Sequence, residues 1–140
     1  MPLRQMEDIM TYKAERWQLQ DLLPSPDAAP GTPEMNAYIK GVQDKLAQFK
    51  TLRADLNANM SAEDFLKIMR LFEALNEAGS ALIAYSYLWF SEDTANQQAL
   101  TYRATVHQMV AEMENDTLFF TLWWKSLEDE AAQRFLKVSG

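Results

Sequence analysis

Apolar side chains recur at every third or fourth position through the middle of the chain, and this spacing predicts one long helix. The apolar positions are Phe65, Ile68, Met69, Phe72, Leu75, Leu82 and Ile83. Because an α-helix turns once in about 3.6 residues, all of them fall on one face. Ser61 is a favoured N-cap, and the pattern continues to the aromatic stretch 85–90, which makes a rod of about 45 Å. Gly79 costs about 1 kcal/mol there relative to alanine, so we expect another helix to approach closely at that position.

Two more long helices and a short one are predicted around this rod. The first has Thr32 as N-cap and Pro33 at the first helical position, and it ends by Asn57. The third begins near Ala95, with a stripe at helical spacing formed by Tyr102, Val106, Met109, Val110, Met113, Thr117 and Phe120. Segment 126–129 supplies a new N-cap followed by acidic residues, which opens the short fourth helix. No segment alternates as a strand would, so we predict an all-α fold, an antiparallel bundle of long helical hairpins.

The chain divides into an N-terminal part and a helical domain. Four prolines and Gly31 between positions 23 and 33 break any regular element, because proline lacks a backbone donor and restricts the residue before it. We therefore predict that residues 1–33 form an arm and a Pro-rich linker that lies on a surface. Residues 34–140 are predicted to form the helical domain.

Charge and composition exclude several classes of function. The net charge is −7, which argues against binding to nucleic acid, because neutralising phosphates requires a basic surface. The chain has no cysteine, and no uncharged stretch approaches the length that crosses a bilayer. The first twelve residues include charged side chains and lack the apolar run of a signal peptide. We expect a cytoplasmic protein without a membrane or nucleic-acid partner.

Segment 84–99, AYSYLWFSEDTANQQA, combines an aromatic helix end, a polar corner and a new helix start. Thr94 and Gln97 fit the capping-box pattern, in which each side chain satisfies a backbone N–H at a helix N-terminus. Asp93 is the competing N-cap. The segment therefore predicts the turn of a long helical hairpin. Its four aromatic residues exceed what one helical stripe can bury, so we expect one face to pack beyond its nearest neighbour.

This corner resembles a segment of the oligoendopeptidase F family of zinc metallopeptidases, whose N-terminal helical region carries A-Y-x-x-L-x-F/Y-S-x-D-T-x-x-x-x-A. Segment 17–24, WQLQDLLP, is similar to the W-x-L-x-D-L opening that precedes the first long helix of the family. Segment 118–124, LFFTLWW, resembles the apolar FF-x-L-x-W segment that follows. The three segments occur in the family's order, and the resemblance spans roughly residues 17 to 138.

The resemblance implies a zinc peptidase that hydrolyses short peptides, with this chain as its N-terminal helical part. The family's H-E-x-x-H helix and downstream glutamate are not present here, where His107 is the only histidine. A catalytic zinc site needs about three protein ligands. We therefore predict no catalytic, metal-binding or cofactor-binding residue in this chain, and an inactive fragment whose parent enzyme binds zinc. By implication, its partners are the catalytic domain of the same polypeptide and, through the whole enzyme, short peptides.

Other candidate sites have simpler interpretations. His107 has Arg103, Ala104, Val110 and Ala111 as turn neighbours, which predicts a histidine without metal partners or a catalytic role. The acidic groups at 112–116 and 128–130 lack the loop spacing of an EF-hand, which predicts solvated helix faces.

Surplus aromatic residues are the remaining candidates for a contact surface. Trp123 and Trp124 point about 100° apart on a helix, so we expect one in the core and the other at its edge. The predicted interface residues are Tyr85, Tyr87, Trp89, Phe90, Trp123 and Trp124. Exposed in an isolated chain, they would favour self-association. The alternative function is a self-contained helical module whose aromatic face binds a partner helix or its own copy.

Overall fold

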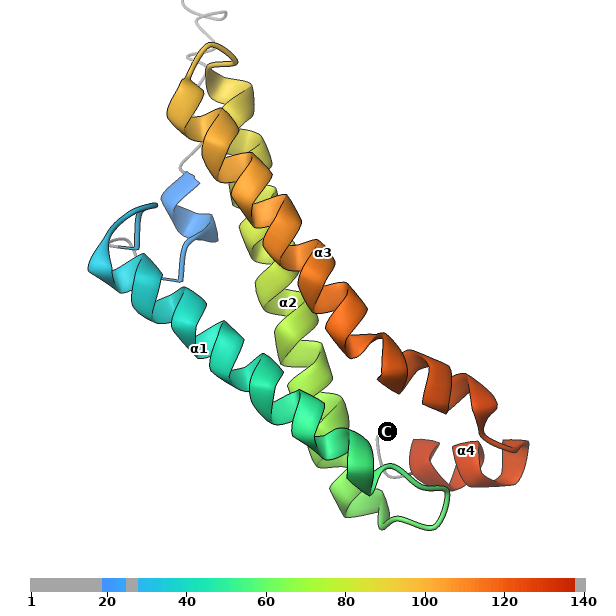
Figure 1. Ribbon diagram of the computed structural model, residues 1–140. Coiled ribbons are helices and arrows are strands. Elements are labelled where there is room, and N and C mark those ends of the chain that lie inside the picture. Colours follow the sequence, from blue (N-terminus) through green and yellow to red (C-terminus); the bar gives the residue numbers. More distant parts are fainter. Residues whose placement is uncertain (1–18, 25–27, 138–140) are drawn as a thin grey trace, which may run out of the picture.

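Four α-helices and two short 3-10 helices make up the described part of the protein. This computed structural model describes residues 19–24 and 28–137. The elements are η3 (Leu19–Leu22), α1 (Pro33–Thr51), η4 (Leu52–Asp55), α2 (Ala62–Glu92), α3 (Gln97–Ser126) and α4 (Asp129–Leu136) (Figure 1). The fold is all-α and built from antiparallel hairpins, as predicted. Most of the predicted N-terminal arm, including Trp17, lies outside the described residues.

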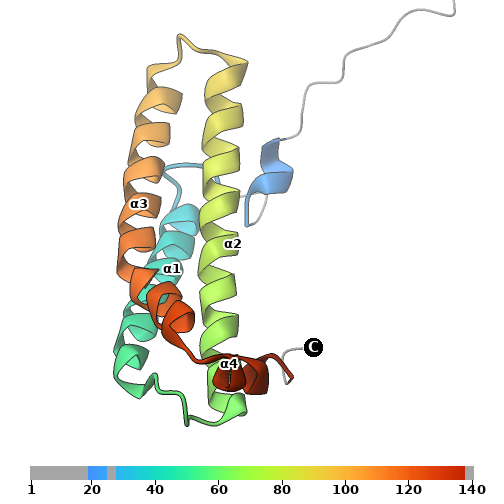
Figure 2. The same ribbon diagram turned by 90° about the vertical axis from the view of Figure 1, so that its right-hand side faces the viewer.

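Helices α2 and α3 form a long antiparallel hairpin, and α1 packs along one side of the pair. Figure 2 shows α2 and α3 side by side, with α4 folded across the lower end of α2, and Figure 1 shows α3 passing in front of α2 and separating from it toward the lower end. Gly79 of α2 is buried where the two long helices pack together. A Cβ atom on Gly79 would lie 2.7 Å from the Met113 Cε atom and 3.7 Å from both methyl groups of Val110. The prediction of a close helix approach at Gly79 is confirmed.

Side-chain caps fix the starts of α1 and α2 where the sequence predicts them. The Thr32 hydroxyl accepts a hydrogen bond from the backbone N–H of Met35 at 3.3 Å. The Ser61 hydroxyl accepts one from Asp64 at 3.0 Å. Each cap satisfies one of the N–H groups that have no partner within the first helical turn.

The corner between α2 and α3 corrects the predicted capping box. Asn96 is the N-cap of α3, and its side-chain oxygen accepts from the N–H groups of Gln98 at 3.0 Å and Ala99 at 3.1 Å. Asp93 instead ends α2, and its carboxylate accepts from the N–H of Ala95 at 3.0 Å. The Thr94–Gln97 box and the Asp93 alternative are therefore both wrong. The physical reason is that α3 starts at Gln97, so Asn96 already satisfies the N–H groups that a cap would serve.

The start of α4 also differs from the prediction. Ser126 belongs to the end of α3, where its hydroxyl donates to the Trp123 carbonyl at 2.6 Å. Glu128 is the N-cap residue, and its side chain makes no capping hydrogen bond. The expected acidic first turn is present as Asp129 and Glu130, which face the positive end of the helix dipole.

Aromatic rings form the centre of the core. Phe49 of α1 is fully buried, and its ring lies 5.8 Å from Phe72, 5.2 Å from Phe119 and 5.7 Å from Phe120. One ring of α1 therefore ties together α2 and α3. The core also reaches the segment predicted as a surface linker, because Ala28 is only 1% exposed.

Candidate functional site

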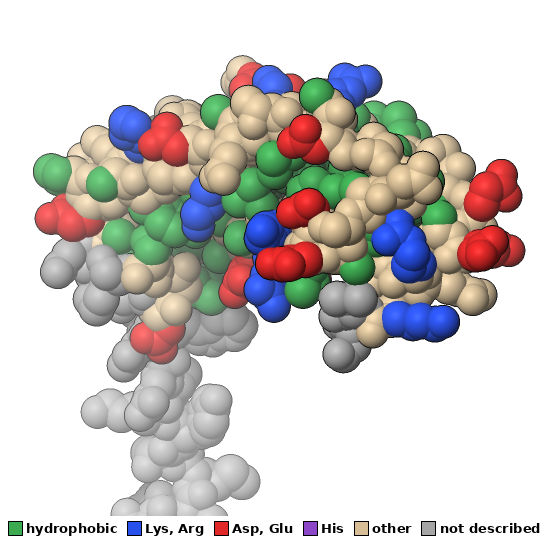
Figure 3. Space-filling view, turned by 90° about the horizontal axis from the view of Figure 1, so that it is seen from below, with side chains coloured by type: hydrophobic (Ala, Val, Ile, Leu, Met, Phe, Trp, Pro, Cys, Tyr) green, Lys and Arg blue, Asp and Glu red, His purple; other side chains and the backbone are tan. Residues whose placement is uncertain are grey.

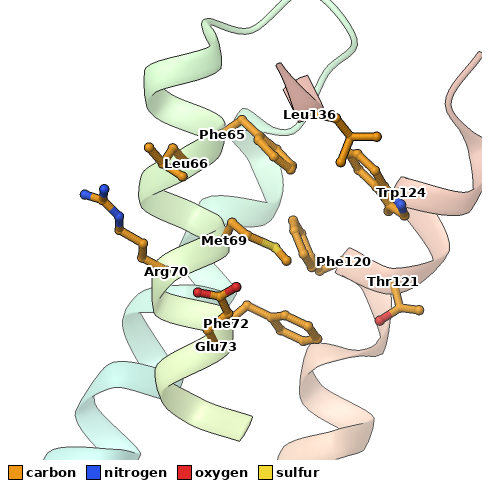
Figure 4. Close-up of a pocket in the computed structure, with 10 residues that line it drawn as sticks. All are labelled: Phe65, Leu66, Met69, Arg70, Phe72, Glu73, Phe120, Thr121, Trp124 and Leu136. Carbon is orange, nitrogen blue, oxygen red and sulfur yellow. The ribbon is translucent and has the colours of Figure 1, made fainter. Parts of the chain in front are cut away.

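A groove of about 570 Å³ opens between α2, α3 and α4. Its lining is mostly apolar and aromatic, with two charged side chains on α2. The lining residues are Phe65, Leu66, Met69, Arg70, Phe72, Glu73, Phe120, Thr121, Trp124 and Leu136 (Figure 4). We refer to this feature as the α2/α3/α4 groove.

The walls of the α2/α3/α4 groove follow from helical spacing. Met69 and Phe72 project from α2 toward α3, where Phe120 and Trp124 project back toward them (Figure 4). Residues three or four positions apart share a face, so each helix lines the groove over consecutive turns. Arg70 is exposed and points away from the apolar wall, so it can contact only the rim of a bound partner (Figure 4).

Helix α4 closes one end of the groove because two of its residues fix it there. The Phe135 ring is fully buried and stacks on Phe65 with 4.5 Å between ring centroids. The Arg134 guanidinium donates to the carbonyl oxygen of Met60 at 2.9 Å and to that of Ala58. This anchoring leaves Leu136 at the groove edge, with 55% of its surface exposed.

The two tryptophans predicted as interface residues lie beside this groove. Both Trp123 and Trp124 are half-buried, so the expected division into one core ring and one edge ring is not observed. Their ring centroids lie 6.2 Å and 5.3 Å from that of Phe65. Only Trp124 lines the groove.

The other four predicted interface residues lie toward the opposite end of the α2–α3 hairpin and divide between its inside and outside. Tyr85 is only 8% exposed and contacts Trp89 and Tyr102, so it is part of the packing. Tyr87 is 53% exposed, and Phe90 is half-buried beside it. The Arg103 guanidinium lies over both rings, 5.5 Å from Tyr87 and 5.0 Å from Phe90. The six predicted residues therefore do not form one continuous surface.

Three phenols gather where α1, α2 and α3 meet. Burial, with the neighbouring Tyr85 and Tyr38 adding to it, raises the pKa of Tyr102 to about 12. Burial also raises the pKa of Tyr85, with Glu92 contributing, and that of Tyr38, with Glu77 contributing. Within the described part of the chain, the buried hydroxyl of Tyr102 makes no hydrogen bond.

Substitution of Tyr102 by phenylalanine is expected to reduce the loss of stability in alkali. A folded-state pKa above the ordinary value of about 10 contributes stability below pH 10, which is lost as the pH rises toward 12. Urea unfolding near pH 11.5 should therefore show Tyr102→Phe losing about 1–2 kcal/mol less than the parent, each relative to its own value at pH 8, the lower figure allowing for solvent screening of a partly exposed ring. Equal losses in the two proteins would contradict this origin of the alkaline sensitivity.

The candidate metal and acidic residues are ordinary surface groups. His107 is exposed on α3, Glu112 accepts a hydrogen bond from the Gln108 amide at 3.1 Å, and Asp116 pairs with Lys50 at 3.1 Å. Among residues 19–24 and 28–137, no three His, Cys, Asp or Glu side chains gather closely enough to hold a metal ion.

The surface around the lower end of the molecule is mixed in character. Viewed from below, hydrophobic side chains gather across its middle, with acidic and basic side chains beside them (Figure 3).

In the described segments, no helix combines the length and apolar character needed to cross a bilayer.

Sequence reasoning identified the groove walls but not the groove. Phe65, Met69 and Phe72 lie on the predicted stripe of α2, where they were assigned to packing alone. The missing signal was the position of α4, which follows from the contacts of Phe135 and Arg134.

Comparison of the chain with protein-family models, curated proteins and solved structures gives no match.

Proposed function

We propose that this chain is the N-terminal helical region of an oligoendopeptidase F-like zinc metallopeptidase, and that it docks on the catalytic part through the α2/α3/α4 groove. The observation that carries this proposal is the resemblance of segment 84–99, which lies at the turn joining the two longest helices. The similar segments 17–24 and 118–124 support it by occurring in the same order.

In the proposed enzyme this chain has an architectural role. The zinc, its ligands and the general base belong to the catalytic part, where a metal-bound water attacks the peptide bond. The helices help to enclose the substrate channel and so restrict access to short unfolded peptides. The isolated chain is expected to cleave no peptide, and the whole enzyme is expected to be cytoplasmic.

The chemistry of the groove favours an apolar helical segment as the docked element. Its walls offer aromatic rings and the Met69 thioether, which adapt to irregular apolar partners. Arg70 and Glu73 at the rim can make polar contacts around a buried apolar centre. Helix-in-groove contacts use this combination of an apolar seam and a polar rim.

Mixing the 140-residue chain with the separately produced polypeptide that follows Gly140 tests the docking site. Thr121 lines the groove and is half-buried, so the arginine of Thr121→Arg should fill the groove. Calorimetry should then show at least roughly tenfold weaker binding of the polypeptide that follows Gly140. Ala47→Arg on the exposed side of α1 is the control and should bind like the parent. Equal binding by both variants, with circular dichroism showing both folded, would reject the groove as the docking site.

A self-contained interaction module is the second candidate, and the same groove favours it. An apolar groove with a polar rim can hold a helix from a separate protein as well as one from the same polypeptide. The two functions differ in where the docked helix is encoded. A partner that occupies the groove and is encoded by another gene would favour the module.

A further inference from the structure

The solvent-facing side of α3 carries a second row of apolar side chains. Leu100, Leu118 and Leu122 are 42%, 49% and 56% exposed, and Ala104 and Ala111 between them are also exposed. Helical geometry places these five residues on one side of α3. The opposite side holds the buried row of Ala99, Val106, Val110, Met113, Thr117 and Phe120. A helix that is apolar on two sides is typical of one that is covered on two sides.

The exposed residues Leu100, Ala104, Ala111, Leu118 and Leu122, which we call the outward row, have a spacing that is the same in both directions along the helix. Successive residues are separated by four, seven, seven and four positions, with Ala111 at the centre. A surface with this property can contact a second copy of itself when the two helices run antiparallel, because a twofold axis exchanges the two ends. The row spans about 33 Å at 1.5 Å per residue, which is long enough for a helix-pair interface.

We propose that this outward face of α3 is the contact surface of a symmetric antiparallel dimer. With the twofold axis at Ala111, Leu100 lies opposite Leu122 of the partner subunit, and Ala104 lies opposite Leu118 of the partner subunit. Ala104 places a small side chain against a large one, and at the axis Ala111 meets Ala111 of the partner subunit, so the two helices can approach closely. The contact removes the three exposed leucines from water in both subunits.

The polar residues beside the row are complementary in the same arrangement. His107 lies four residues before Ala111 and Glu114 three residues after it, on the same side of the row. The twofold axis therefore places His107 beside Glu114 of the partner subunit. The two residues are offset by about 1.5 Å along the helix axis, the rise of one residue. An imidazole N–H can donate to that carboxylate. On the other side, Gln108 meets Asn115 of the partner subunit in the same way, and all four side chains are exposed.

This dimer is independent of the proposed peptidase function, because it uses the face of α3 that points away from the core. Sedimentation of the 140-residue chain should show dimers forming between low micromolar and several hundred micromolar concentrations. Ala111→Arg places two guanidinium groups at the twofold axis and should weaken association at least roughly tenfold. Ala47→Arg, at an exposed site on α1, should associate like the parent.

A cysteine cross-link gives a second measurement that does not depend on weakening the dimer. The chain has no cysteine, so Ala111→Cys introduces a single thiol at the axis. Mild oxidation should convert it rapidly to a disulfide-linked dimer, whereas Ala47→Cys should remain largely monomeric. A monomer at every concentration, a dimer unaffected by Ala111→Arg, or equal cross-linking of the two cysteine variants would overturn the proposal. Circular dichroism of each variant distinguishes lost association from lost folding.

Discussion

Replacing Phe65 by alanine should lower the free energy of unfolding by about 3–5 kcal/mol, the range for removing a buried aromatic ring. Phe65 is only 3% exposed. Its ring lies close to the rings of Phe120, Trp123, Trp124 and Phe135. The substitution therefore removes one of the two contacts that fix α4, the stacking of Phe135 on Phe65, as well as part of the groove wall. Small domains are stable by about 5–15 kcal/mol, so this loss is a large share of the total.

Leu66 is the matched control for Phe65. It is adjacent in sequence and also lines the groove, but it is half-buried and points away from Phe120 and Trp124 (Figure 4). We expect Leu66→Ala to cost roughly 1 kcal/mol, because less of its side chain is buried. Urea unfolding followed by tryptophan fluorescence measures both variants. Equal losses, or a loss below about 1 kcal/mol for Phe65→Ala, would contradict the assigned role of the aromatic cluster.

Gly79→Ile should be the most disruptive change along the contact between α2 and α3, with an expected cost of about 3 kcal/mol. A Cβ atom at this position already comes within 3.7 Å of both Val110 methyl groups, so the branches of isoleucine have no space. The helices must separate or Val110 must leave its position. Thermal unfolding monitored by circular dichroism measures the loss.

Gly79→Ala separates steric crowding from helix propensity. Its Cβ would lie 2.7 Å from the Met113 Cε atom, which is the end of a flexible side chain and can move. Alanine also favours the helix over glycine by about 1 kcal/mol, which offsets the cost of that movement. We expect a net change within about 1 kcal/mol of the parent. If isoleucine were tolerated as well as alanine, close packing at Gly79 would not explain the glycine.

The helices could be predicted from the sequence because each depends on local signals. The caps at Thr32 and Ser61 and the apolar row of α2 act within a few residues, so spacing alone locates them. The corner was harder, because Asp93, Thr94 and Asn96 can all cap a helix. The choice depends on which backbone N–H groups remain unsatisfied once α2 has ended.

The groove could not be predicted because it depends on contacts far apart in the sequence. Arg134 reaches the carbonyl of Met60 across the fold, and Phe135 stacks on Phe65. Neither pairing leaves a periodic pattern in the chain. The exposed leucines of α3 show the same limit, since an apolar residue in a helix is expected to be buried until neighbouring elements are placed.

The coding sequence beyond the codon for Gly140 tests the proposed function most directly. The peptidase hypothesis places the zinc ligands and the general base in the polypeptide that follows the helical region. It therefore predicts an in-frame continuation that contains H-E-x-x-H and a downstream glutamate. A stop codon directly after Gly140, or a continuation that lacks this motif, would contradict it.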